Sequence, residues 1–241
     1  MPGRALSEFP PEQEPATVPG WFGKVVMLGD FAHRRLTPEF IEACDHWLSS
    51  CISASRTQLG DRWLDTYLTA PLWRFAWAPG VVGEFWWFGV LTPSVDAVGR
   101  YFPLVVALPN QSAPLTADAL EALANWYSHN RRAALATLNV GASLESFEAE
   151  LQRSPALRAV TSAPAHVEWK AGRTRHVLQG RASLADWAQA LAGPPVVDKY
   201  AGHSFWLRSI ADDLDSDESN LTVVVGLPEP DQFALMLEGR W

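Results

Sequence analysis

Two opposite charges lie four residues apart inside one of the most apolar stretches of the chain. The segment LTPSVDAVGRYFPLVVALP, residues 91–109, carries the carboxylate of Asp96 and the guanidinium of Arg100. A catalytic carboxylate needs a partner base, a nucleophile or a metal ion, and the neighbouring residues supply none. Ser94 and Asp96 can instead bond local backbone N–H groups, while Arg100 holds the carboxylate. We expect the pair to lock a turn; chemistry and partner binding are the alternatives.

Other segments resemble catalytic or ligand-binding motifs without completing them. GWFGK, residues 20–24, has its first glycine too close for a phosphate loop, and a valine follows the lysine. GHSFW, residues 202–206, has tryptophan where a nucleophile elbow requires glycine. The acidic residues 213–217 lack the turn glycine and closing glutamate of a calcium loop. The six histidines show no metal-ligand spacing. We therefore predict no catalytic residue, cofactor or metal, and no enzyme.

Composition restricts the class of partner. The chain has 241 residues, a formal net charge of −8 and a pI of about 5.2. An acidic chain of this kind argues against a nucleic-acid partner and against anionic membranes, because both select basic surfaces. No stretch is long and apolar enough for a membrane span, and the first residues have no signal-peptide core. We expect no nucleic-acid binding and no membrane insertion.

Two cysteines point to a reducing compartment. Cys44 and Cys51 are seven residues apart in a segment that reads as one helix. This places them roughly 10 Å apart along the helix axis. A disulfide needs Cα atoms within about 7 Å, so the two thiols cannot pair with each other. Two free thiols suit the cytoplasm, which is the location we expect.

The elements that must position Asp96 and Arg100 follow from caps, breakers and hydrophobic periodicity. Thr37 and Pro38 predict the start of a helix that ends at Gly60. Further helices are predicted at residues 61–68, from Thr116 to Asn130, after Ser143 and after Ser183. Strands are predicted at residues 24–28, 72–78, 84–92, 101–109, 204–209 and 221–227, with a hairpin at 166–179.

These elements predict one domain after a polar tail. Residues 1–19, rich in proline and glutamate, are expected to form a flexible tail. Residues 20–241 are expected to form a single compact α+β domain. Its sheet is predicted to be mixed, largely antiparallel and flanked by helices, because no regular alternation of strand and helix is present.

Three blocks of sequence resemble the TagF family, also called ImpM, of type VI secretion systems. They are GWFGKVVMLGDFAHRRL, WLSSCISASRTQLGDRWLDTYLTAPLWRF and GVLTPSVDAVGRYFPL, which occur in this order. The resemblance covers residues 21–108. It implies a cytoplasmic accessory protein that represses the secretion machine after translation by binding Fha, the forkhead-associated scaffold protein. It brings no known catalytic residue.

The resemblance and the residues together suggest where a partner binds. We expect the surface to combine the GWFGK…GDF segment with the PSVDAVGR loop, with Trp21 and Phe22 as exposed anchors. The residues expected to bind the partner or shape the site are Trp21, Phe22, Gly23, Lys24, Gly29, Asp30, Phe31, Ser94, Asp96 and Arg100. A small-ligand-binding protein, or an enzyme with an unrecognised site near the PSVDAVGR loop, is the alternative.

Overall fold

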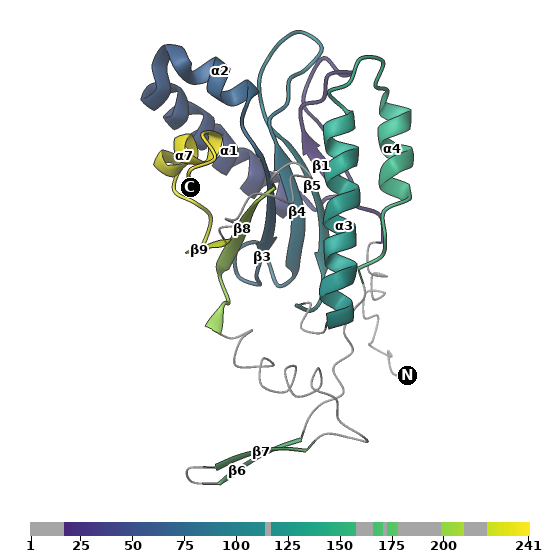
Figure 1. Ribbon diagram of the computed structural model, residues 1–241, viewed down its shortest axis with the longest axis vertical. Coiled ribbons are helices and arrows are strands. Elements are labelled where there is room, and N and C mark those ends of the chain that lie inside the picture. The colour runs from purple at the N-terminus through teal and green to yellow at the C-terminus, as the bar shows by residue number, and fades with distance from the viewer. Residues whose placement is uncertain (1–16, 114–116, 158–165, 171–172, 178–198, 210–220) are drawn as a thin grey trace, which may run out of the picture.

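A seven-stranded antiparallel sheet organises the chain (Figure 1). The computed structural model describes residues 17–113, 117–157, 166–170, 173–177, 199–209 and 221–241. The strand order is β2-β1-β5-β4-β3-β8-β9, and every neighbouring pair is antiparallel. The strands are β1 (Gly20–Gly23), β2 (Ala32–Arg34), β3 (Leu72–Trp77), β4 (Trp86–Thr92), β5 (Leu104–Asn110), β8 (His203–Ser209) and β9 (Leu221–Val225).

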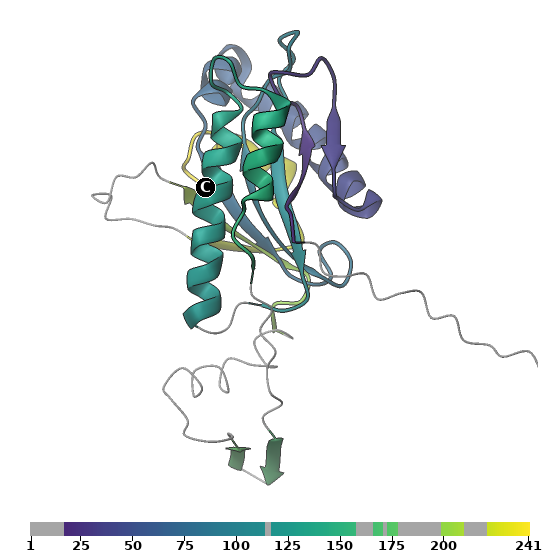
Figure 2. The same cartoon turned by 90° about the vertical axis from the view of Figure 1, so that its right-hand side faces the viewer.

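Helices cover the two faces of the sheet and create two apolar cores. Helices α1 (Pro38–Leu59), α2 (Trp63–Leu68) and α7 (Phe233–Leu237) lie on one face, and α3 (Ala117–Ala136) and α4 (Leu144–Gln152) on the other (Figures 1 and 2). Short 3-10 turns precede α2 (Gly60–Arg62) and α7 (Pro230–Gln232). This arrangement confirms the α+β prediction, with a sheet that is antiparallel among all described neighbours.

Helix boundaries follow the predicted caps. Thr37 Oγ1 accepts a hydrogen bond from the Phe40 backbone N–H at 3.3 Å, and Gly60 ends α1. Ser143 begins α4 with a reciprocal capping box to Ser146. Helix α3 continues to Ala136, six residues beyond the predicted end, because nothing in its sequence breaks it there. The positions of these helices were therefore readable from local sequence.

The predicted strand at residues 24–28 is wrong. The strand lies earlier, at β1, and the chain leaves the sheet after Gly23 into a turn in which the Leu28 N–H donates to the Val25 carbonyl at 3.0 Å. The apolar run reflects burial of Val25 in a core rather than pairing in a strand. Strand β5 also begins later than predicted, at Leu104, because the preceding Pro103 has no N–H to donate.

Other predictions have separate outcomes. The hairpin is confirmed as β6 (His166–Lys170) paired with β7 (Arg173–Val177). Cys44 and Cys51 are both buried and free. The predictions for residues 1–16 of the tail, for the Thr116 cap, for the helix after Ser183 and for the acidic loop lie outside the described residues.

Candidate functional site

The two loops that carry the predicted site residues lie at one end of the sheet. The connection between β1 and β2 spans residues 24–31, and that between β4 and β5 spans residues 93–103. Strands β1 and β5 are neighbours, with Gly23 opposite Leu104, so the two loops leave from adjacent strand ends. Both lie at the upper end of the sheet in Figure 1. Sheet topology therefore brings together segments that are about seventy residues apart in sequence.

Asp96 lies in the second loop with its carboxylate buried and fully engaged. The residue is 2% exposed. Its Oδ2 accepts hydrogen bonds from Lys24 Nζ at 2.8 Å and from Arg100 Nε at 2.7 Å. Its Oδ1 accepts from the backbone N–H groups of Val98 at 3.1 Å and Arg100 at 2.8 Å. We call Lys24, Asp96 and Arg100 the Asp96 clamp.

The electrostatics of the clamp favour the ionised carboxylate. Burial alone would raise the pKa of Asp96, because the charged form loses its hydration. The hydrogen bonds from Lys24, from the backbone and side chain of Arg100, and from the Val98 N–H outweigh burial and hold this pKa below its ordinary value. Asp96 is consequently an anchor for two cations and is unsuited to act as a general base near neutral pH.

The clamp also ties the two loops to each other. Besides binding Asp96, the Arg100 guanidinium donates to the carbonyl of Gly29 and lies 3.4 Å from Asp30 Oδ1. The Ala97 backbone N–H donates to the Leu28 carbonyl at 2.8 Å. One loop is thereby fixed against the other by side-chain and backbone bonds together, which confirms the expectation that the charged pair locks a turn.

Helix α2 supports the base of the second loop through a residue that sequence reasoning missed. The Tyr67 hydroxyl donates to the Ser94 carbonyl at 2.9 Å and accepts from the Ser94 N–H at 3.0 Å. Ser94 therefore acts through its backbone, and its Oγ has no hydrogen-bond partner among the described residues. Nothing local marks Tyr67, because its partner is 27 residues further along the chain.

Four side chains project from the locked loops into solvent. Phe31 is 46% exposed and Val98 is 67% exposed, while the charged side chains of Asp30 and Arg100 are also exposed. The Phe31 ring packs edge-on against Phe102, with ring centroids 4.7 Å apart, and Lys24 Nζ lies 4.8 Å from its centroid. We call Asp30, Phe31, Val98 and Arg100 the loop rim; its members come from both loops.

The expectation that Trp21 and Phe22 are exposed anchors is wrong. Trp21 is 1% exposed and Phe22 is 4% exposed. They are successive residues of β1, so their side chains point to opposite faces of the sheet and enter the two cores. Because β1 is paired with β2 and β5 and covered on both faces, neither aromatic ring is available to a partner.

Trp21 belongs to a second buried polar cluster, which joins α4 to β1. Its Nε1 donates to Glu148 Oε1 at 2.6 Å, and Arg35 donates to Glu148 Oε2 at 2.7 Å. Burial alone would raise the pKa of Glu148, but the bonds from Arg35 and Trp21 and the nearby Arg34 lower it. Nothing local in the sequence marks Glu148 for this role, because Trp21 lies 127 residues away along the chain.

The predicted glycines have different roles. Gly23 has a φ of 129°, and a Cβ built on it would lie 2.1 Å from the Pro103 carbonyl oxygen. Gly99 has a φ of 83° in the turn that follows Asp96. Gly29 has neither constraint, since a Cβ there would meet nothing within 4 Å. Close backbone approach explains the first glycine and turn geometry the second.

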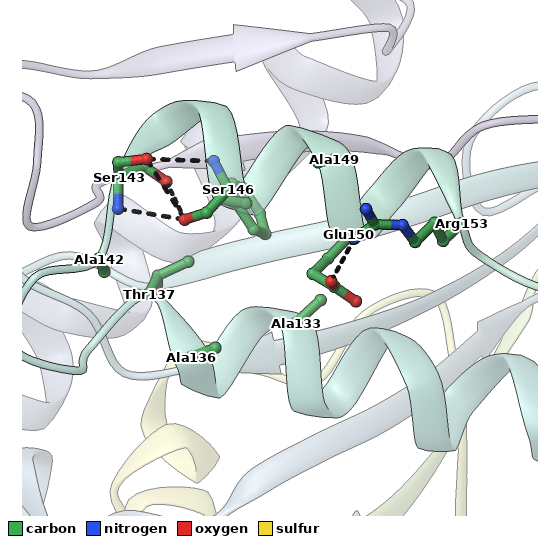
Figure 3. A pocket seen from close by; sticks show the side chains of 10 residues that line it. Ala133, Ala136, Thr137, Ala142, Ser143, Ser146, Ala149, Glu150 and Arg153 are labelled. Atoms are coloured by element: carbon green, nitrogen blue, oxygen red, sulfur yellow. Dashed lines mark hydrogen bonds and ion pairs between the residues drawn. The ribbon is translucent and has the colours of Figure 1, made fainter.

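A groove of about 340 Å³ lies between α3 and α4, away from the loop rim (Figure 3). Alanine side chains from both helices form part of its walls, and serine, threonine, phenylalanine, glutamate and arginine side chains form the rest. Ser143 and Ser146 bond each other at one end, and Glu150 pairs with Arg153 at the other. No residue of the loop rim lines it. Its polar groups are thus engaged with one another rather than directed together at a bound molecule.

Two further properties restrict what the described part of the chain can do. Among the described residues, no group of three or more His, Cys, Asp or Glu side chains is arranged to hold a metal ion. None of the described helices combines the length and apolar character that a membrane crossing requires. The charged side chains that the two loops offer are therefore those of the Asp96 clamp and the loop rim.

Comparison with known proteins places these loops in a family. Residues 20–154 match the TagF N-terminal domain, described as type VI secretion system-associated. The chain belongs to the TagF family. A solved structure, that of PA0076 from Pseudomonas aeruginosa PAO1, is 34% identical and superposes with a TM-score of 0.68, covering 92% of this chain and 94% of that one. No curated protein matches the sequence.

The matched span contains the whole candidate site of this TagF chain. Both loops, the Asp96 clamp, the loop rim and Glu148 lie between residues 20 and 154. Strands β8 and β9 and helix α7 lie after it and complete the sheet and one of its cores. The family description therefore applies to the part of the molecule that carries the clamp.

Proposed function

We propose that this TagF protein is a cytoplasmic negative regulator of a type VI secretion system, acting after translation by binding the scaffold protein Fha. The family match supports an association with the secretion system. The resemblance on which the sequence analysis rests implies repression through Fha. The surface that the two loops present also supports the proposal.

The proposal rests on one observation: the loop rim is exposed, and the buried Asp96 clamp holds it in place. Phe31 and Val98 expose apolar surface, and Asp30 and Arg100 add opposite charges beside them. Aromatic and arginine side chains are enriched among residues that dominate protein–protein binding. Because Asp96 fixes both loops from beneath, little conformational entropy is lost when a partner covers the rim. These features suit a preformed docking surface.

The alternative, a ligand site or active site at the PSVDAVGR loop, finds less support. Both Asp96 oxygens are already bound by protein donors, and the lysine and arginine that bind them are held in the same contacts. The buried Ser94 hydroxyl lacks a partner among the described residues, but a hydroxyl alone supplies neither a base nor an activated nucleophile. We therefore favour a binding module over an enzyme.

Titration of the purified chain with Fha from the same organism, phosphorylated and unphosphorylated, tests the function. We expect binding to at least one form, and the difference between them measures how phosphothreonine affects it. Val98→Lys and Phe31→Ala should each weaken binding about tenfold or more, equivalent to roughly 1.4 kcal/mol. Leu120→Ala, which removes an equally exposed apolar side chain from α3, should leave affinity unchanged.

The controls separate failure of the surface from failure of the function. Circular dichroism and thermal melting should show that each variant is folded. Binding that persists unchanged in both rim variants would contradict the docking surface while leaving the Fha interaction intact. Absence of binding to either form of Fha would contradict the proposed function itself.

A further inference from the structure

Among the described strands, β9 forms one edge of the sheet, and it carries none of the charges or prolines that commonly protect such an edge. It reads Leu-Thr-Val-Val-Val, without charge or proline, and its residues alternate between exposed and half-buried. The opposite edge, β2, has only three residues, and His33 and Arg34 stand on it. Soluble proteins protect free edges with short strands, charges or prolines. Among the described residues, β2 therefore has these protective features and β9 does not.

The hydrogen-bond register shows which backbone groups of β9 face outward. The Gly226 N–H donates to the Gly202 carbonyl at 2.6 Å. Gly202 directly precedes β8 and Gly226 directly follows β9, so this hydrogen-bonded pair fixes the pattern of the ladder between the two strands. Hydrogen-bonded and non-hydrogen-bonded pairs alternate along an antiparallel ladder. The backbone N–H and C=O groups of Leu221, Val223 and Val225 therefore point away from β8, and they have no partner among the described residues.

The same three residues also expose their side chains. Leu221 is 61% exposed, Val223 37% and Val225 77%. On β8 they stand opposite Leu207, Phe205 and His203, on the face of the sheet that carries α3. An apolar strip and a row of unpaired backbone groups thus coincide on one short strand. An extended strand of a partner can form hydrogen bonds with all of these backbone groups, whereas a single inserted side chain cannot.

We propose that β9 pairs with β9 of a second copy of this chain, antiparallel and about a two-fold axis through Val223. Each copy offers three N–H and three C=O groups at this edge, and the symmetric pairing joins them in six hydrogen bonds, leaving none over. Val223 then faces the same residue of the second copy, and Leu221 faces its Val225. The edge is self-complementary, as a two-fold interface requires.

Side-chain chemistry supports the same occupant. Directly opposed residues of an antiparallel pair lie on the same face, so the exposed aliphatic side chains of both copies form one continuous strip. No charged residue stands on β9, so no like charges meet across the pair. The dimer that results has a single sheet running through both copies.

Sedimentation velocity of the full chain over a wide concentration range tests this inference. We expect a reversible monomer–dimer equilibrium. Because each copy carries a net charge of −8, added salt should screen the repulsion between them and strengthen the dimer. Val223→Lys and Val225→Lys should each give a monomer. Val98→Lys, the same substitution at an exposed valine of the loop rim, should leave the dimer intact.

Proline variants test the backbone register independently of side-chain charge. Val223→Pro removes an outward N–H, so it should abolish the dimer while the monomer keeps its circular dichroism spectrum. Val224→Pro removes an N–H directed at β8 and should disturb the fold instead. A wild-type chain that stays monomeric at every concentration and salt level, or a folded Val223→Lys chain that still dimerises, overturns the proposal.

Dimer formation and Fha binding can be tested independently of each other. Val223→Lys should leave Fha affinity unchanged, and Val98→Lys should weaken it without affecting the dimer. If the wild-type chain is a monomer and Val223→Lys loses Fha binding, the edge takes a strand from Fha, and the second-copy proposal is wrong.

Discussion

At the scale of single residues, the central fact is a carboxylate surrounded by donors. Asp96 accepts four hydrogen bonds and stands between a buried lysine and an exposed arginine. Lys24 is only 4% exposed. Removing its anion would leave a cation with little access to water, which is among the more costly changes in a folded protein.

We therefore predict that Asp96→Ala destabilises the fold. The melting temperature should fall by roughly 10 °C, because Lys24 is left buried without its counter-charge. Asp30→Ala removes an exposed carboxylate that also contacts Arg100 and should change the melting temperature little. Thermal unfolding followed by circular dichroism measures both. Equal melting temperatures for the Asp96 variant and the wild type would refute the structural role.

The same carboxylate makes stability depend on pH. Its pKa is lower in the folded chain than in the unfolded chain, so its stabilising contribution is complete above the ordinary aspartate pKa of about 3.9. That contribution is lost as pH falls from about 5 towards the depressed folded value. In Asp96→Asn the melting temperature should therefore fall less steeply with acidification. Glu148, whose pKa is also lowered in the folded chain, contributes to the pH dependence in the same direction. If the melting temperature of Asp96→Asn depends on pH as steeply as that of the wild type, Asp96 is not the source of this dependence.

At the scale of elements, backbone contacts decide how the loops leave the sheet. Strand β1 approaches Pro103 so closely that only glycine fits at position 23. Helix α4 is fixed over β1 by the bond between Trp21 and Glu148, and its start is set by the Ser143 capping box. The loop rim therefore depends on elements that contain none of its residues.

Gly23, at the end of β1, and Gly29, in the loop that follows it, should respond differently to substitution by alanine. Gly23→Ala should destabilise by about 2 kcal/mol or more, because the new Cβ would meet a carbonyl oxygen and the backbone has a positive φ. Gly29→Ala should be neutral, or stabilise by up to about 1 kcal/mol, because its Cβ enters open space. Urea unfolding of both variants measures the difference. Equal stabilities would contradict the close approach.

At the scale of the whole molecule, strand β1 contributes side chains to both apolar cores. Trp21 packs beneath α3 and α4, and Phe22 packs on the face that carries α1. Neither core is independent of the other, because they share the sheet between them. A change on β1 is consequently transmitted to both helical layers.

The double variant Trp21→Ala with Phe22→Ala should unfold the chain. Each truncation of a buried aromatic residue costs about 3–5 kcal/mol, and domains are commonly stable by only about 5–15 kcal/mol. Phe31→Ala, at a half-exposed aromatic residue of the loop rim, is the matched control and should remain folded. Circular dichroism distinguishes them. A folded double variant would show that burial of the pair contributes little.

Local sequence determined a substantial part of this protein. The helix starts at Thr37 and Ser143, the end of α1 at Gly60 and the main strands follow from caps, breakers and alternation between near neighbours. Family membership also follows from contiguous blocks of residues. The pairing of Asp96 with Arg100 was predictable, since the two lie within one turn of chain.

Only the tertiary structure decided which residues the site exposes. Lys24 reaches Asp96 across 72 residues, and Trp21 reaches Glu148 across 127. An aromatic pair beside glycines suits both a docking surface and a core strand, so local sequence does not show that Trp21 and Phe22 are buried rather than surface anchors. Burial depends on which strands flank β1 and which helices cover it, and these neighbours come from distant parts of the chain. Caps and turns act between adjacent residues, whereas exposure and long-range ion pairs exist only once the sheet has assembled.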